Sequence, residues 1–127
     1  MKAKIEKYIP AALNQIKIYY IANSNRPIKK EYKSYLSSIG ASIIMSGLLP
    51  TLAVYYSQDS KADRLDVINW VFNIVKPIYD IGNHNDDLFK YAVRIKDNKE
   101  LTNRLIEDVL NISIALKLSI RTFPLTK

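Results

Sequence analysis

The stretch that decides the fold is Lys30–Ser57, KEYKSYLSSIGASIIMSGLLPTLAVYYS. Its apolar residues recur at spacings of three and four, which predicts one buried face of a helix that begins near Ile28. Gly47 is expected to end this helix, and Pro50 fits the first turn of a short apolar helix that follows. Gly40 and the small residues next to it would let another helix approach closely. The stretch therefore predicts two helices that meet at a break.

Similar spacing predicts helices in the rest of the chain. Pro10 either starts or kinks the first helix, and Pro77 should kink or end the fourth. We expect Asn85 or Asp86 to cap the fifth helix, and Ser60 with Asp63 to form a capping box before the fourth. The predicted class is all-α, one helical domain spanning residues 1–127, with about five to six helices. The further helices are expected at Lys4–Ala22, Leu65–Ile78, Leu88–Ile95 and Lys99–Phe123.

The segment Lys99–Phe123 fits two patterns. Its apolar residues alternate between Ile112 and Ile120, which is strand periodicity, yet from Leu101 onward they also fit the helical template over a longer span. No glycine or turn residue marks a hairpin partner, so helix is the favoured interpretation. Because its C-terminal end is apolar on nearly all sides, we expect this helix to lie at the centre of the core and to end by Pro124.

The charge of the chain favours an anionic partner. The net charge is +7 and the sequence pI is about 9.5, which is typical of proteins that bind nucleic acid or a membrane surface. The acidic segment Asp59–Asp87 separates two basic regions and could contact a basic neighbour or another copy of the chain. Cysteine is absent, no apolar run reaches the length of a membrane span, and no signal peptide is evident, so we expect a cytoplasmic protein without membrane contact.

The residue types that enzymes need are scarce. His84 is the one histidine, and a metal site would require it to join nearby aspartates in a polar loop, a weak pattern. Neither GxSxG nor a phosphate-binding glycine motif is present. The acid pairs Asp86–Asp87 and Glu107–Asp108 are adjacent in sequence, so within a helix their side chains would point about 100° apart. We therefore expect no catalytic residue, no metal and no cofactor.

Three clusters of basic residues are candidates for RNA binding. Lysines three or four residues apart share a helix face, and one helical turn advances ~5.4 Å, comparable to the phosphate spacing of an extended strand. Such a row can follow a nucleic-acid backbone without reading bases, although a solvated helix face is the alternative for each cluster. Lys17 could extend the surface. The clusters comprise Arg26, Lys29, Lys30 and Lys33; Lys90, Arg94 and Lys96; and Lys117 with Arg121.

Nine tyrosines are many for 127 residues. In the adjacent pairs Tyr19–Tyr20 and Tyr55–Tyr56, one ring of each pair is expected to face the core and the other to lean outward. An exposed ring could stack on a base or anchor a protein contact. Buried or half-buried packing is expected for most of the nine.

The basic helix KEYKSYLSSIGASIIMSGLL, followed by TLAVYYSQ and a further helical bundle, resembles the small helical subunit of type III-B CRISPR effector (Cmr) complexes. The resemblance covers most of the chain, and the passage around Ser46-Gly47-Leu48 is its most specific part. The last helix departs from the family pattern, since Ala115–Arg121 keeps Lys117 and Arg121 but lacks the tryptophan often found there.

The resemblance implies a non-catalytic scaffold in antiviral defence. Copies would stack as a filament beside the backbone and large subunits of the Cmr complex, and their basic faces would help hold guide RNA and single-stranded target RNA. Two alternatives stay open. One is a helical protein–protein adaptor without RNA contact, such as a type III-A-like small subunit or a phage protein, and the other is a small helical ribonuclease.

Overall fold

The computed structural model of the chain describes residues 2–58, 62–82 and 85–127. All elements in these ranges are helices. The described residues form seven helices, of which six are longer than the five-residue α1. The all-α prediction is confirmed, and the described residues contain no strand, only an isolated bridge between Ile28 and Leu125. In chain order the helices are α1 (Lys2–Glu6), α2 (Ile9–Ala22), α3 (Glu31–Ser46), α4 (Leu48–Tyr56), α5 (Ala62–Ile78), α6 (Leu88–Arg94) and α7 (Lys99–Ile120).

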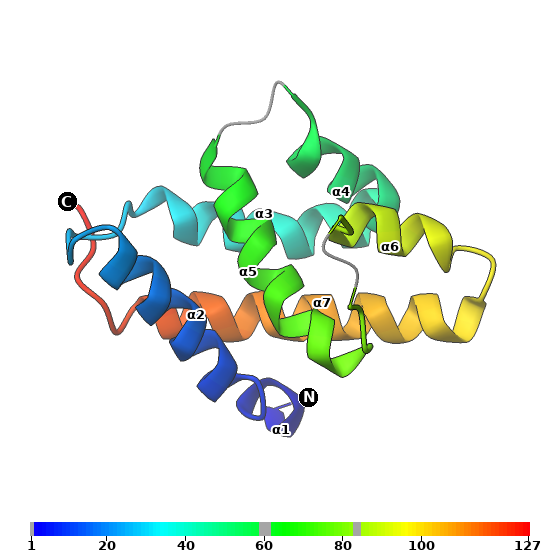
Figure 1. Cartoon of the computed structure of the whole chain (residues 1–127), viewed down its shortest axis with the longest axis horizontal. Helices are drawn as coiled ribbons and strands as arrows, with labels where there is room; N and C mark the ends of the chain where they lie inside the picture. Colours follow the sequence, from blue (N-terminus) through cyan, green and yellow to red (C-terminus); the bar gives the residue numbers. More distant parts are fainter. Residues whose placement is uncertain (1, 59–61, 83–84) are drawn as a thin grey trace.

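The two long helices α3 and α7 run antiparallel and side by side, and α5 crosses both of them (Figure 1). Helix α7 also packs against α1 and α2, so it is the central helix, and the helical interpretation of this segment is confirmed. Its apolar C-terminal end is not buried on all sides, however. Ile114 is 40% exposed and Leu118 is 45% exposed. The helices that pack against α7 therefore leave part of the circumference of its C-terminal end uncovered.

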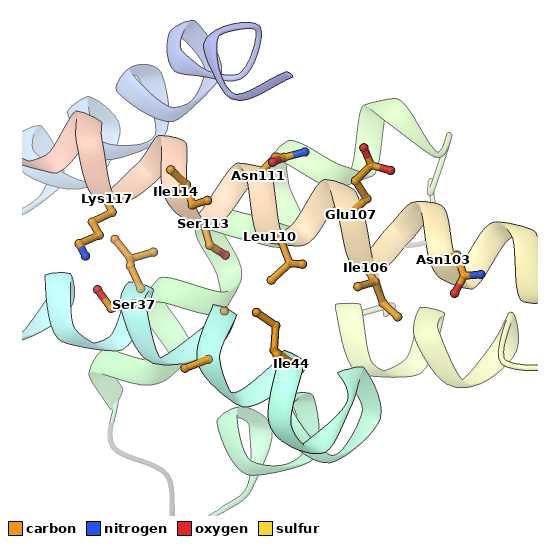
Figure 2. A pocket seen from close by; sticks show the side chains of 13 residues that line it. Ser37, Ile44, Asn103, Ile106, Glu107, Leu110, Asn111, Ser113, Ile114 and Lys117 are labelled. Atoms are coloured by element: carbon orange, nitrogen blue, oxygen red, sulfur yellow. The ribbon is translucent and has the colours of Figure 1, made fainter. Parts of the chain in front are cut away.

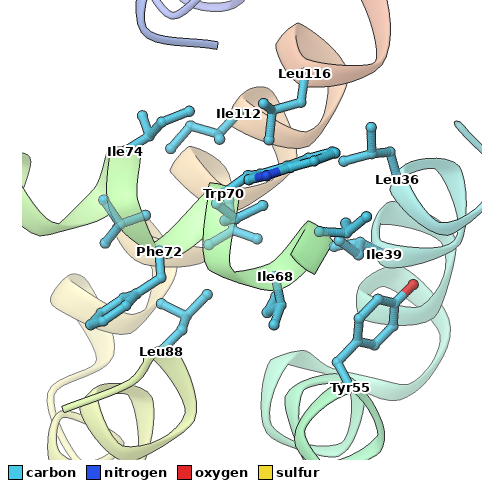
Figure 3. Packing of buried hydrophobic residues seen from close by; sticks show 14 of the residues in the cluster. Leu36, Ile39, Tyr55, Ile68, Trp70, Phe72, Ile74, Leu88, Ile112 and Leu116 are labelled. Carbon is cyan, nitrogen blue, oxygen red and sulfur yellow. The ribbon is translucent and has the colours of Figure 1, made fainter. Parts of the chain in front are cut away.

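Trp70 of α5 occupies the middle of the core, close to Leu36 of α3 and Leu116 of α7 (Figure 3). Its ring centroid lies 5.2 Å from that of Tyr19 and 5.2 Å from that of Tyr32. Aromatic pairs at this separation add about 0.5–1.5 kcal/mol beyond the area they bury. The indole therefore joins α2, α3, α5 and α7 into one helical bundle.

Gly47 separates α3 from α4, as predicted. Its φ is +95°, a conformation that favours glycine, and its N–H donates to the carbonyl oxygen of Ile43 at 2.9 Å. Thr51 Oγ1 donates to the carbonyl oxygen of Gly47 at 2.9 Å, so the 2.6 Å contact between Ser42 Oγ and Thr51 Oγ1 uses the serine proton. Pro50 sits in the first turn of α4. These contacts hold the break in one geometry.

Local signals located most of the other helix ends. Pro10 lies in the first turn of α2, and Pro77 is the penultimate residue of α5. Asn98 caps α7, its Oδ1 accepting from the N–H of Leu101 at 3.1 Å. The capping box predicted for Ser60 lies outside the described residues.

The cap of α6 differs from the prediction. Asp87, rather than Asn85 or Asp86, is the N-cap, and its Oδ1 accepts from the N–H of Lys90 at 2.7 Å. The side chain of Asp86 turns inward instead, where it pairs with Arg94. Asn85, Asp86 and Asp87 could each cap this helix, and the ion pair with Arg94 removes Asp86 from that role.

Candidate nucleic-acid interface

The densest basic cluster lies at the start of α3. Arg26, Lys29 and Lys30 are exposed in the segment that leads into the helix, and Lys33 is half-buried in its first turn. Lys30 occupies the N-cap position. The cluster therefore lies at the N-terminal end of a long helix, where the helix dipole adds to the positive potential.

The C-terminal segment of the chain is tied to this cluster. The N–H of Ile28 donates to the carbonyl oxygen of Pro124 at 2.8 Å, and the N–H of Thr126 donates to the carbonyl oxygen of Ile28 at 2.9 Å. The N–H of Lys30 donates to Thr126 Oγ1 at 3.0 Å. These bonds form the bridge between Ile28 and Leu125, and they hold the end of α7 next to the start of α3.

Two of the clusters that are separate in sequence therefore meet. Because α3 and α7 are antiparallel, the last turns of α7 lie beside the first turns of α3. Lys117 is half-buried and points across to Ser37 of α3 (Figure 2), and Arg121 is exposed one turn later. We call this surface the basic end; it comprises Arg26, Lys29, Lys30, Lys33, Lys117 and Arg121.

One acidic residue, Asp63, neutralises part of the positive charge of the basic end. Lys29 Nζ lies 3.3 Å from Asp63 Oδ1, at the start of α5, and this hydrogen bond raises the pKa of Lys29. Asp63 is a neighbour of the basic end that the sequence did not reveal, because no local pattern links it to Lys29. Among the described residues no carboxylate forms an ion pair with Lys30, Lys33 or Arg121. Most of the positive charge here is available to a ligand.

The remaining predicted residues lie elsewhere. Arg94 ends α6 and Lys96 follows it, and this end of α6 lies at the opposite end of the molecule's long axis from the start of α3 (Figure 1). Arg94 Nη2 lies 2.6 Å from Asp86 Oδ2, and Lys96 Nζ lies 3.5 Å from Asp97 Oδ1. Lys17 is exposed on α2. The structure thus separates these three from the basic end, and it gives Arg94 and Lys96 carboxylate partners.

No tyrosine is fully exposed, and all nine are buried or half-buried, as expected for most of them. In the pair Tyr55–Tyr56 the first is buried and the second half-buried, whereas Tyr19 and Tyr20 are both half-buried, so the expected contrast is present in one pair. Tyr55 donates to the carbonyl oxygen of Tyr35 at 2.8 Å, and Tyr56 Oη accepts from the N–H of Leu88 at 3.2 Å. Burial raises the pKa of Tyr55 to about 12. The tyrosines serve the packing of the bundle, and base stacking on an exposed ring has no candidate here.

Neighbouring acids point to different partners, as expected. Glu107 contacts Lys4, whereas Asp108 accepts hydrogen bonds from Tyr8 at 2.8 Å and from Tyr79 at 2.6 Å. Within the described ranges no group of three or more His, Asp or Glu side chains is close enough to hold a metal ion, and His84 lies outside those ranges. None of the described helices is long and apolar enough to span a membrane.

A groove between α3 and α7 is the second surface feature. It has a volume of 680 Å³ and begins at Lys117, next to the basic end (Figure 2). Apolar side chains that include Ile44 and Ile114 line it. The sequence placed these residues among apolar helices without showing that they would stay uncovered.

Comparison with known proteins identifies the family. A family model described as "CRISPR-associated protein (Cas_Cmr5)" matches residues 6–117, which is most of the chain. The searches of curated proteins and of solved structures gave no match. The matched residues include α2 to α6 and nearly all of α7, and so contain the resemblance noted around Gly47. The chain therefore belongs to the Cas_Cmr5 family of CRISPR-associated proteins, the small subunits of type III-B Cmr complexes.

Proposed function

We propose that this protein is a non-catalytic small subunit that helps hold guide and target RNA in a type III-B effector complex, through its basic end. In this role it would contact the backbone and large subunits, stack with further copies of itself and act in antiviral defence in the cytoplasm. Cleavage would belong to other subunits. Family membership supports the place in the complex, and the arrangement of charge supports the contact with RNA.

The observation that carries the RNA proposal is the convergence of two basic clusters. Lys30 and Lys33 at the start of α3 and Arg121 just after α7 are distant in sequence but lie at one end of the bundle, without ion-pair partners among the described residues. Ammonium and guanidinium groups gathered in this way bind phosphates and release counterions, independently of base sequence. Buried tyrosines and a surface without an open ring favour backbone contact over base stacking.

The non-catalytic role is proposed because each of the four candidate acids already has a partner within the chain, Glu107 with Lys4 and the others as follows. Asp108 accepts two tyrosine hydroxyls, Asp87 caps α6, and Asp86 pairs with Arg94. A general acid or base needs a free proton-accepting atom beside its substrate. We expect the purified chain to leave RNA intact.

Reconstitution of the effector complex tests the proposal. A complex rebuilt with the Lys30→Glu/Lys33→Glu variant should keep its subunit composition and cleave saturating target RNA at the wild-type rate. Its affinity for target RNA should fall, because two phosphate contacts are reversed in sign. Unchanged affinity would favour the adaptor without RNA contact, and a loss of cleavage at saturating target would contradict the non-catalytic role.

A further inference from the structure

A shallow pocket between α2 and α5 combines polar and apolar side chains. Its volume is 260 Å³, below the range of pockets that hold drug-sized ligands, so it has room for about one side chain. No lysine or arginine is among the described residues that line it. Its polar lining comprises Gln15, Asp66, Asn69 and Asn73, and its apolar lining includes Ile18 and Ala22.

The half-buried carboxylate of Asp66 is held in position on the α5 side of the pocket. Tyr32 donates to Asp66 Oδ2 at 2.7 Å, and Asp63 Oδ1 lies farther from the same hydroxyl, at 3.3 Å. Because the proton of Tyr32 is used there, the hydroxyl of Tyr19 donates to that of Tyr32 at 2.8 Å. Burial, followed by these hydrogen bonds, raises the pKa of Tyr32. The phenol therefore stays neutral, and its hydrogen bond leaves the negative charge of the carboxylate in place.

No basic side chain balances this charge. Asp63 is paired with Lys29, but among the described residues no lysine or arginine forms an ion pair with Asp66. Lys17 falls on the side of the α2 helical wheel that faces away from the pocket. The pocket is therefore a negatively charged site, which attracts a cation and repels a phosphate.

The other polar groups of the pocket suit a planar cation. Asn69 and Asn73 are exposed and follow Asp66 along α5 at spacings of three and four, which places them on one helix face. A guanidinium group has five N–H donors in one plane and no acceptor, so it can bind a carboxylate and carboxamide oxygens together. The aliphatic stem of an arginine would then lie along Ile18 and Ala22.

An apolar rim favours an arginine that belongs to a protein over a free cation. Ile18 borders the pocket and is 55% exposed, and Ile21, one turn further along α2, is 59% exposed. A protein segment that inserts an arginine would also cover these side chains. An arginine in a desolvated pocket, surrounded by contacts that exclude water, is a common centre of protein interfaces.

The chain's own arginines are engaged elsewhere, so a second copy is not the expected source of the guanidinium group. Three of them have partners in the same molecule, and two belong to the basic end. These are Arg64 over the ring of Tyr35, Arg94 beside Asp86, Arg104 beside Asp108, and Arg26 with Arg121.

We propose that the α2–α5 pocket binds an arginine side chain of a different subunit of the effector complex, with Asp66 as its carboxylate partner. Charge complementarity and the isoleucine rim together select this occupant. The inference rests on the proposed place of the chain in a complex with other subunits. It assigns one of those contacts to a site that contains no residue of the basic end.

Nuclear magnetic resonance of the isolated chain tests the pocket, with N-acetylarginine amide as the probe. The probe should shift the side-chain amide signals of Gln15, Asn69 and Asn73 in a saturable way. Its neutral analogue N-acetylcitrulline amide, which has the same shape, should bind at least about tenfold more weakly, because hydrogen bonds to a charged group are lost. Equal binding of the two probes, or binding of neither, would overturn the site.

Two conservative variants show whether Asp66 makes the difference. Asp66→Asn keeps an oxygen that can accept from Tyr32, so the fold should persist, but its preference for the arginine probe should disappear. Asp97→Asn, at an exposed carboxylate after α6, should retain the preference. A preference that survives in the Asp66 variant would contradict the assigned partner.

Competition during reconstitution tests the occupant. Wild-type chain and a variant with a distinct mass label are mixed in equal amounts with the other subunits, and their ratio in the purified complex is measured. Asn69→Lys places a cation at an exposed position of the pocket and should enter the complex at least about tenfold less than the wild type. Asn14→Lys, at an exposed position of α2 that does not line the pocket, should enter equally. Equal entry of the Asn69 variant would refute the proposal.

Two measurements exclude the other occupants. Sedimentation of the isolated chain should be the same for Asn69→Lys and the wild type, and a difference would assign the pocket to a second copy. RNA affinity should not fall in Asp66→Asn, and a fall would assign the pocket to RNA; either result would overturn the proposal. The RNA proposal fails separately, if reversal of Lys30 and Lys33 leaves RNA affinity unchanged while the pocket variants behave as expected.

Discussion

Lys29 Nζ and Asp63 Oδ1 lie 3.3 Å apart and join the segment before α3 to the first turn of α5. The lysine side chain is 59% exposed and the aspartate side chain 19% exposed. This ion pair withholds one positive charge from the basic end. A phosphate that binds there must compete with the carboxylate of Asp63.

Replacing Asp63 by Asn should therefore strengthen RNA binding. Ion pairs between exposed side chains are weak and screened by salt, so the affinity gain should reach at most about fivefold at low salt. Fluorescence anisotropy with a labelled single-stranded RNA measures it. Asp97→Asn, at an exposed carboxylate in the turn after α6, is the control and should change nothing. An unchanged affinity in the Asp63 variant would show that Lys29 does not reach RNA.

Asp108 should be important for stability. It accepts hydrogen bonds from Tyr8 and Tyr79, and its side chain is 14% exposed. Asp108→Ala would leave two partly buried phenol hydroxyls without their acceptor, and we expect the free energy of unfolding to fall by about 2–4 kcal/mol. Urea denaturation followed by circular dichroism gives the value. Asp97→Ala should stay within about 0.5 kcal/mol of the wild type, and a similar loss in both variants would refute the role of the Tyr8–Asp108–Tyr79 contacts.

The buried tyrosines predict loss of stability at alkaline pH. Burial raises the pKa of Tyr55 to about 12, whereas the phenol of an unfolded chain ionises near 10. The folded state then holds a proton that the unfolded state has lost, so this contribution to stability is complete below about pH 10 and disappears as the pH rises toward 12. The pKa is raised in the same direction, mainly by burial, for Tyr8, Tyr32, Tyr56, Tyr79 and Tyr91.

Ultraviolet absorbance of tyrosinate, recorded together with helical circular dichroism, measures this effect. We expect most of the phenols to ionise only as the helices unfold. If all nine tyrosines ionised near pH 10 while the helices persisted, their burial would be wrong.

The sequence predicted features that depend on neighbouring residues. Gly47 and Pro10 fix helix ends through backbone geometry and short-range hydrogen bonds, and both predictions are confirmed. The cap of α6 was missed because Asp86, a plausible cap, pairs with Arg94 in the last turn of the same helix. Capping propensity alone does not show which of several candidate caps has another partner.

The candidate site was predicted only in pieces. Periodicity identified the lysines near the start of α3 and the pair Lys117 and Arg121, but their convergence depends on the antiparallel packing of α3 against α7. The groove was missed for the same reason. Ile44 and Ile114 look like core residues in the sequence, and only the packing of the helices shows that they are exposed.

The most direct test compares charge reversals at the two ends of the bundle. Lys30→Glu/Lys33→Glu changes the basic end, and Lys96→Glu/Lys99→Glu makes the same change in charge near the start of α7. Both variants place glutamate in or just before the first turn of a helix, where a negative charge is tolerated or favoured. The measurement is the affinity for a single-stranded RNA as a function of salt concentration.

We predict that the basic-end variant binds RNA at least about tenfold more weakly than the wild type. In a plot of log affinity against log salt concentration, its slope should be shallower by about 1.4, the value for two lost phosphate contacts on a single strand. The variant near α7 should keep the wild-type slope. Equal losses in both variants, or no loss in either, would contradict the assignment of RNA binding to the basic end.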